Sequence, residues 1–206
     1  GIKLKGLNWA IETSDDQVAK SVLLDTDMYW IRNPNVLIRQ VSIDTFAMYQ
    51  SEGFILGSNN KSINRYEEGL KGKNVKCGEK NYQLSPESSM WRSSVIGIHH
   101  SNREILNEAF DLFCCLSPFV AAHTVEQFAL SEVIRDHRYK KIPAKKFLND
   151  WSSIGRKNHA TSVLGAFFEK YGEHDFNKHL EKLHEVRIRR PLSTLIKQKL
   201  ARWKKR

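Results

Sequence analysis

The fold is decided by the stretch Ser21-Val22-Leu23-Leu24-Asp25-Thr26-Asp27-Met28-Tyr29-Trp30. Its first four residues predict a short buried strand, and two carboxylates separated by one residue follow directly. In α/β sheets, ligands usually bind just past the carboxyl ends of the strands. Carboxylate oxygens are ligands that Mg²⁺ and Mn²⁺ prefer. The stretch therefore predicts a divalent metal site at Asp25 and Asp27 and, with it, diphosphate chemistry; the alternative is a pair of solvated turn residues.

The composition indicates one globular domain in the cytoplasm. The chain has 206 residues, of which 40% are hydrophobic, which is ordinary for a single core. No stretch approaches the roughly 20 apolar residues that span a bilayer, and the N-terminus lacks the pattern of a signal peptide. The three cysteines include an adjacent pair and no CxxC, which argues against a disulfide framework or a CxxC metal site.

The positive charge is concentrated at the C-terminus. Residues 187–206 hold nine Lys or Arg and no acid, whereas residues 1–186 hold 24 basic and 23 acidic side chains. Apolar residues recur at helical spacing in this extension, namely Leu192, Leu195, Ile196, Leu200 and Trp203. We predict a basic amphipathic helix over 187–206, either on an anionic membrane surface at the inner face of the membrane or packed on its own domain. Nucleic-acid binding ranks third, because interleaved aromatic residues and a known reading motif are missing.

Strands and helices alternate along residues 1–186, which predicts an α/β fold. Apolar runs with strand character occupy residues 21–24, 45–49 and 94–99. Helical spacing of apolar residues covers 4–11, 102–116, 124–134 and 162–171. The segment 58–78 is rich in Gly, Asn and Lys and predicts a loop or an excursion from the fold, followed by an edge strand over 81–84.

Three motifs follow one another along this chain. An apolar strand leads into Asp25-Thr26-Asp27; then come Met90-Trp91-Arg92-Ser93-Ser94-Val95-Ile96-Gly97-Ile98-His99 and His123-Thr124-Val125-Glu126-Gln127-Phe128-Ala129-Leu130. In this order, residues 4–151 resemble nucleotide-sugar glycosyltransferases of the GT-A fold, especially bacterial enzymes of surface-polysaccharide assembly. The resemblance implies a GT-A-like, Rossmann-like mixed sheet flanked by helices.

The resemblance also implies an activity. Such enzymes move a sugar from a nucleoside-diphosphate donor, here a UDP-sugar by analogy, to a saccharide or lipid-linked acceptor, with Mn²⁺ or Mg²⁺ as cofactor. Because only 24 residues precede Asp25, the domain over 1–186 is expected to lack most of the N-terminal nucleotide-binding half.

The resemblance assigns roles to particular positions. Asp25 and Asp27 would hold the metal. The sugar pocket would be lined by Trp91, Arg92, Ser93 and Ser94. Glu126 and Gln127 would face the transferred sugar or the acceptor, with Glu126 as a general base or an orienting group.

Simpler interpretations of these positions remain open. Residues 91–94 also fit an ordinary turn before a strand, and Glu126 fits a first-turn acid that complements a helix dipole. Arg92 and Ser94 depart from the Asn and Gly usual in the family, so the identity of the sugar does not carry over.

The C-terminal motif of the family is altered in this chain. Residues 149–157 lack the usual His, so Asn149, Asp150 or His159 are candidates for a further metal ligand, and Arg156 and Lys157 for contacts with the diphosphate. The sequence therefore leaves two alternative functions, a catalytically silent membrane-associated scaffold that keeps the fold and a basic nucleic-acid-binding module.

Overall fold

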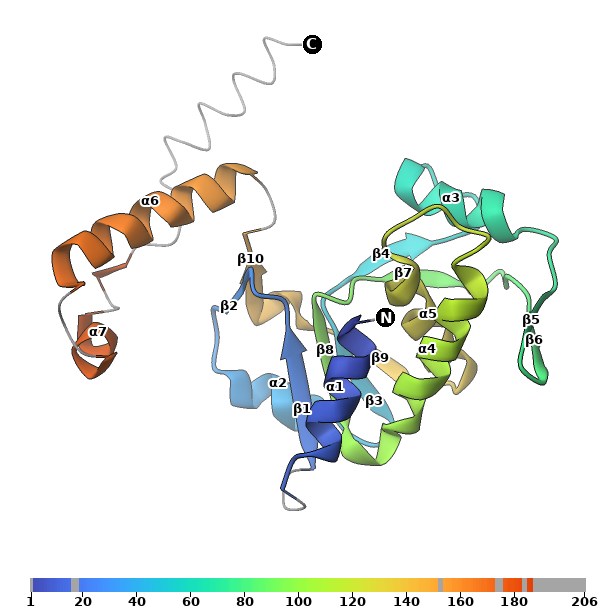
Figure 1. Ribbon diagram of the computed structural model, residues 1–206, viewed down its shortest axis with the longest axis horizontal. Helices are drawn as coiled ribbons and strands as arrows, with labels where there is room; N and C mark the ends of the chain where they lie inside the picture. Colours follow the sequence, from blue (N-terminus) through green and yellow to red (C-terminus); the bar gives the residue numbers. More distant parts are fainter. Residues whose placement is uncertain (1, 16–18, 152–153, 173–175, 183–184, 187–206) are drawn as a thin grey trace, which may run out of the picture. The chain divides into compact units, whose positions relative to one another are not determined.

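The computed structural model describes residues 2–15, 19–151, 154–172, 176–182 and 185–186, which fall into two compact units divided after Asn149 (Figure 1). The fold is mixed α/β, as predicted. The first unit holds α1 (Ile2–Glu12), β1 (Lys20–Leu24), β2 (Met28–Trp30), α2 (Pro34–Gln40), β3 (Thr45–Met48), β4 (Ser51–Phe54), α3 (Lys61–Leu70), β5 (Val75–Cys77), β6 (Lys80–Tyr82), β7 (Ser89–Trp91), β8 (Val95–His99), the short 3₁₀ helix η1 (His100–Asn102), α4 (Glu104–Leu116), α5 (Val125–Asp136), β9 (Lys140–Pro143) and the 3₁₀ helix η2 (Ala144–Lys146). β10 (Leu148–Asp150) spans the division between the units, and the second unit contains α6 (Ile154–Tyr171) and α7 (Phe176–Lys182).

The main sheet has four strands in the order β1-β8-β3-β9. β8 runs antiparallel to both β1 and β3, and β3 runs parallel to β9. Consequently β1, β3 and β9 point the same way, and their carboxyl ends share one edge of the sheet, which we call the carboxyl edge. The strands predicted over 21–24, 45–49 and 94–99 are confirmed as β1, β3 and β8.

Smaller strand pairs accompany the main sheet. β4 pairs with β7, β5 with β6, and β2 with β10. The predicted edge strand over 81–84 corresponds to β6, which is shifted toward the N-terminus and pairs with β5 in a hairpin.

The main sheet is packed on both faces, because successive residues of a strand point to opposite sides. One face buries Phe46, Met48, Ile96 and Ile98 together with apolar residues of α1, α4 and α5. The other face buries Ala47, Tyr49 and Val95 with Leu37 of α2 and with Phe147 and Leu148. Helix α1 belongs to the first layer, because Leu4, Leu7 and Ile11 are buried at helical spacing.

The predicted helices over 4–11, 102–116 and 124–134 are confirmed as α1, α4 and α5, and the one over 162–171 is the C-terminal part of the longer α6. The predicted loop over 58–78 is wrong, because α3 and β5 lie within it. Asn60 caps α3 by accepting a hydrogen bond from the Ser62 N–H, and Ile63, Tyr66 and Leu70 bury one face of the helix. The polar composition of the segment hides this apolar spacing.

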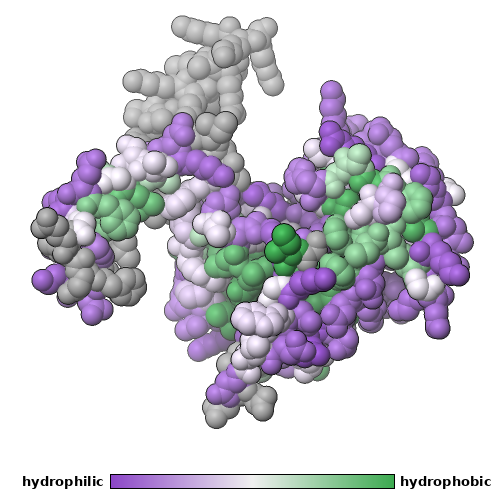
Figure 2. Space-filling model, in the orientation of Figure 1, coloured by the Kyte–Doolittle hydropathy of each residue, from purple (hydrophilic) through white to green (hydrophobic). Residues whose placement is uncertain are grey.

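None of the helices within the described parts of the chain is both long and apolar enough to cross a membrane. The basic amphipathic helix predicted over 187–206 lies outside the described residues. The face of the first unit seen in Figure 2 carries hydrophobic surface near α1, where the exposed fraction is 90% for Ile2 and 66% for Trp9.

Candidate functional site

The two acids of the opening motif lie in a turn at the carboxyl edge. β1 ends at Leu24, which is opposite Val95 at the start of β8. The Asp25 N–H donates to the Ser94 carbonyl oxygen at 2.9 Å, and the Asp25 carbonyl oxygen accepts from the Met28 N–H at 3.0 Å. The second bond closes a β-turn over residues 25–28 that carries both carboxylates. The turn is thereby fixed beside the segment 91–94.

The segment 91–94 links β7 to β8 along the same edge. The Trp91 N–H donates to Ser131 Oγ of α5 at 3.1 Å, and Ser93 and Ser94 are buried. The Arg92 guanidinium lies 5.0 Å from the ring centre of Tyr49, which follows β3. This cation–π contact places a positive charge near the end of β3.

Gln127 connects this segment to α5 and to β4. Its buried side-chain Oε1 accepts a hydrogen bond from the Ser93 N–H at 3.0 Å, and its Nε2 donates to Glu52 Oε2 at 2.9 Å. Glu52 lies at a bulge in the β4–β7 pairing, where the register shifts between Ser51 and Gly53. Bulges re-aim side chains and are frequent beside active sites. No sequence motif singles out Glu52, although the neighbouring Gly53, which has a φ of 111°, is the residue type that marks such bulges.

The start of α1 contacts two of the predicted site residues. Glu126 Oε1 accepts a hydrogen bond from the Leu4 N–H at 2.8 Å, so it satisfies one of the first N–H groups of α1, which have no partner within the helix. The neighbouring Lys3 Nζ lies 2.6 Å from Asp25 Oδ1. No sequence motif singles out Lys3, because both contacts join segments that are distant in sequence.

The donor set at the turn fits a divalent ion that arrives with a diphosphate. Asp25 and Asp27 supply hard carboxylate oxygens, while the described residues contain no group of three or more His, Cys, Asp or Glu side chains able to hold a metal. Mg²⁺ is usually bound by one or two carboxylates, with waters and substrate phosphates completing its coordination. Two carboxylates at the carboxyl edge match this mode.

The predicted C-terminal contacts belong to the second unit. Arg156 donates from one guanidinium nitrogen to the Asp150 carbonyl oxygen at 2.9 Å and to Asp150 Oδ1 at 3.0 Å. Asp150 is buried, so this ion pair compensates its charge. Lys157 is exposed, and His159 is half-buried. The Asp150 carboxylate is therefore engaged by Arg156 within its own unit.

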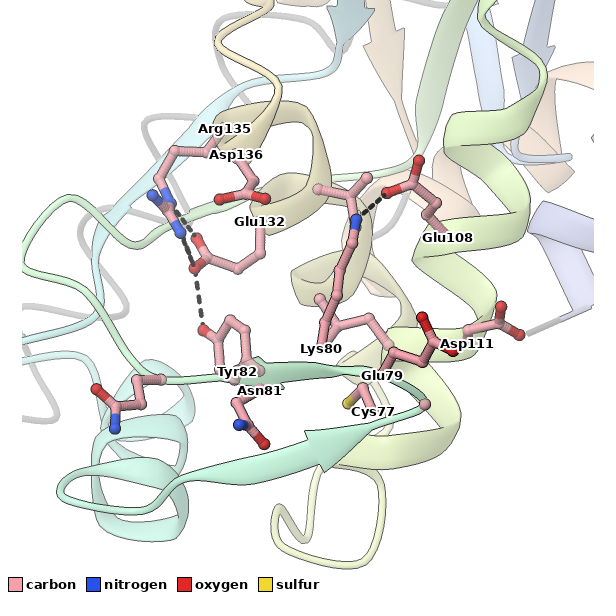
Figure 3. Close-up of a pocket in the computed structure, with 14 residues that line it drawn as sticks. Cys77, Glu79, Lys80, Asn81, Tyr82, Glu108, Asp111, Glu132, Arg135 and Asp136 are labelled. Atoms are coloured by element: carbon pink, nitrogen blue, oxygen red, sulfur yellow. Dashed lines mark hydrogen bonds and ion pairs between the residues drawn. The ribbon is translucent and has the colours of Figure 1, made fainter.

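A cavity of about 440 Å³ lies away from the carboxyl-edge segments, between the β5–β6 hairpin, α4 and α5 (Figure 3). In its wall the fully buried Glu132 accepts hydrogen bonds from Tyr82, Ser88 and Arg135. Burial, followed by the charge of Glu132, raises the pKa of Tyr82 above its ordinary value, so this phenol stays a donor. Because three donors satisfy Glu132, we interpret this wall as a structural network. No sequence motif marked the cavity.

The carboxyl edge thus brings together three segments that the sequence singled out, namely residues 25–27, 91–94 and 126–127. Lys3 and Glu52 join them, whereas Arg156 and Lys157 lie in the other unit. A scan against models of known protein families finds no match to this chain, and a search of curated proteins finds none either.

Proposed function

We propose that this chain is a metal-dependent glycosyltransferase with a GT-A-like arrangement that moves a sugar from a nucleoside-diphosphate donor to a saccharide or lipid-linked acceptor in surface-polysaccharide synthesis. Mn²⁺ or Mg²⁺ is the proposed cofactor. The basic residues of 187–206 are proposed to attract the enzyme to an anionic membrane surface.

The observation that carries the proposal is the meeting of the three motif segments at the carboxyl edge. The Asp25 N–H donates to the Ser94 carbonyl oxygen, and Gln127 accepts from the N–H of the adjacent Ser93, so the segments 25–27, 91–94 and 126–127, to which we assign the metal, the sugar and the acceptor, are neighbours. Segments separated by as many as a hundred residues reach this arrangement only through the fold. The order of the motifs in the sequence and their adjacency in space support the same function.

In this proposal the residues at the carboxyl edge have different roles in sugar transfer. A divalent ion bound by Asp25 and Asp27 would supply Lewis-acid stabilisation of the departing diphosphate. The segment 91–94 would position the sugar, because Gln127 holds the Ser93 N–H in place. Glu52, which Gln127 holds through one oxygen, and Glu126 are the carboxylates that we propose accept a proton from an acceptor hydroxyl.

The test is isothermal titration of the chain with UDP, with and without Mn²⁺. We expect binding that depends on Mn²⁺ and that Asp27→Asn weakens by at least about tenfold, because even groups behind the metal ligands contribute that much to metal affinity. Asp44→Asn is the matched control, since Asp44 is exposed and directly precedes β3, at the end of the sheet opposite the carboxyl edge. A folded chain that binds no UDP with Mn²⁺ would contradict the proposal.

A further inference from the structure

The first turn of α1 reaches over the proposed donor site. Lys3 Nζ contacts Asp25 Oδ1 at 2.6 Å, and the next residue, Leu4, donates its N–H to Glu126. Leu4 is almost completely buried in the core, so the helix holds the Cα of Lys3 in a fixed place beside the turn. One cation of the chain is therefore anchored next to a predicted metal ligand.

We infer that Lys3 is a donor-binding residue, whose ammonium group contacts the phosphate oxygens of the nucleoside diphosphate when the donor is bound. This inference rests on the proposed function. Without a donor, the ammonium group pairs with Asp25, as the structure shows. With a donor, the same group moves a short distance from the carboxylate to the phosphate.

Charge balance supports this role. Asp25, Asp27 and a diphosphate together carry more negative charge than one divalent ion neutralises, so a further cation is needed beside the turn. Lysine is a common phosphate ligand in proteins, because its ammonium is a compact charge on a flexible stem.

Exchange between the two partners is physically easy. The side chains of Lys3 and Asp25 are 37% and 30% exposed, and ion pairs open to solvent contribute little net stability. The four-carbon stem allows the ammonium group to swing while Leu4 keeps the backbone in place. Leaving Asp25 also frees its carboxylate oxygen for the metal ion.

If Lys3 had a different role and only blocked the metal site, replacing it would change the affinity for UDP in the opposite direction. If the ammonium group only occupied the metal site, its removal would tighten the binding of both Mn²⁺ and UDP. If it binds phosphate, its removal leaves Mn²⁺ binding equal or tighter but weakens the binding of UDP.

The experiment measures the affinity of the full chain for UDP at saturating Mn²⁺ by titration calorimetry, and for Mn²⁺ alone by the spin-resonance signal of the free ion. Lys3→Gln should weaken UDP binding by about tenfold, which is the effect of losing one charge-assisted hydrogen bond, and Lys3→Arg should restore most of it. Lys5→Gln is the matched control, because Lys5 lies two residues further along α1, with Nζ 4.3 Å from the ring centre of Phe110. Circular dichroism melts establish that each variant is folded.

The outcomes separate this inference from the proposed function. If Lys3→Gln binds UDP as tightly as the wild type, or more tightly, while Asp27→Asn loses binding, then the role of Lys3 is wrong and the proposed function stands. If the wild type binds no UDP in the presence of Mn²⁺, both are wrong. Weaker binding in Lys3→Gln that Lys3→Arg does not restore would also contradict a charge contact with phosphate.

Discussion

At the scale of single residues, the candidate site depends on an amide. Gln127 accepts a hydrogen bond from Ser93 and donates one to Glu52, and its amide has a separate acceptor atom and donor atom for these two partners. The acids Asp25 and Asp27 could be predicted, because an apolar run ending in carboxylates is a local pattern. Lys3 and Glu52 could not, because their contacts cross from one element to another and leave no mark on neighbouring positions.

Lys141 is a half-buried cation next to this network. Its Nζ donates to the Ser131 carbonyl oxygen at 3.1 Å and lies 5.9 Å from the ring centre of Trp91. Burial lowers the pKa of Lys141 to about 8, although the nearby charge of Glu132 opposes that shift. An unfolded lysine has a pKa of about 10.4. Between these two pH values the unfolded chain binds a proton that the folded chain does not, so this group makes the folded state more stable as pH rises.

We therefore predict that Lys141→Met changes the pH dependence of stability. The free energy of unfolding of the variant, relative to that of the wild type, should be highest near pH 7, where burial of the ammonium costs the wild type most. The difference should shrink steadily as pH rises above 8. Urea unfolding at a series of pH values measures it, with Lys140→Met as the exposed control. A difference that is constant with pH would contradict the lowered pKa.

At the scale of elements, the apolar periods of α1, α4 and α5 and the apolar runs of β1, β3 and β8 made these parts predictable. The same reasoning failed for α3, because Ile63, Tyr66 and Leu70 are spaced along one face of a helix that is otherwise polar. β7 was also missed. It has three residues, too few for a period, and it forms through pairing with β4.

β8 contains a glycine where the central strands approach closely. A Cβ atom added at Gly97 would lie 2.8 Å from Ala47 Cβ and 3.0 Å from Val41 Cγ2. We predict that Gly97→Ala lowers the free energy of unfolding by about 1–3 kcal/mol, the usual cost of overpacking a core. Gly6→Ala in α1 is the control: a Cβ there meets nothing within 4 Å, so the variant should gain up to about 1 kcal/mol from helix propensity. Chemical denaturation of both variants measures these changes. A free energy of unfolding that Gly97→Ala leaves unchanged would show that Ala47 and Val41 can move away from β8.

At the scale of the whole molecule, the two main clusters of buried apolar side chains draw on residues 4 to 148, all within the first unit. A unit with its own core is expected to fold independently. The sequence predicts one domain over 1–186, and the structure groups the chain into two compact units that divide after Asn149. Hydrophobic spacing indicates which residues are buried, but it does not indicate which buried residues share a core.

We predict that a fragment of residues 1–151, which retains all of β10, unfolds in one cooperative transition. Its midpoint should lie within about 5 °C of the corresponding transition in the full chain, because a change of 1 kcal/mol moves the midpoint by about 2–4 °C at this size. Calorimetry of both chains makes the comparison. A broad, non-cooperative transition in the fragment would mean that the first unit requires the second.

The parallel pairing of β3 with β9 also has a consequence for how the protein is made. Thr45 pairs with Lys140, so the partners are separated by nearly half the chain. Contacts this distant in sequence slow folding, because the loop between them must close first. During translation, β3 emerges from the ribosome long before β9 and keeps an open edge throughout that interval. Assembly of the complete main sheet therefore waits until β9 has emerged, and until then the unpaired edge of β3 makes the nascent chain prone to aggregation.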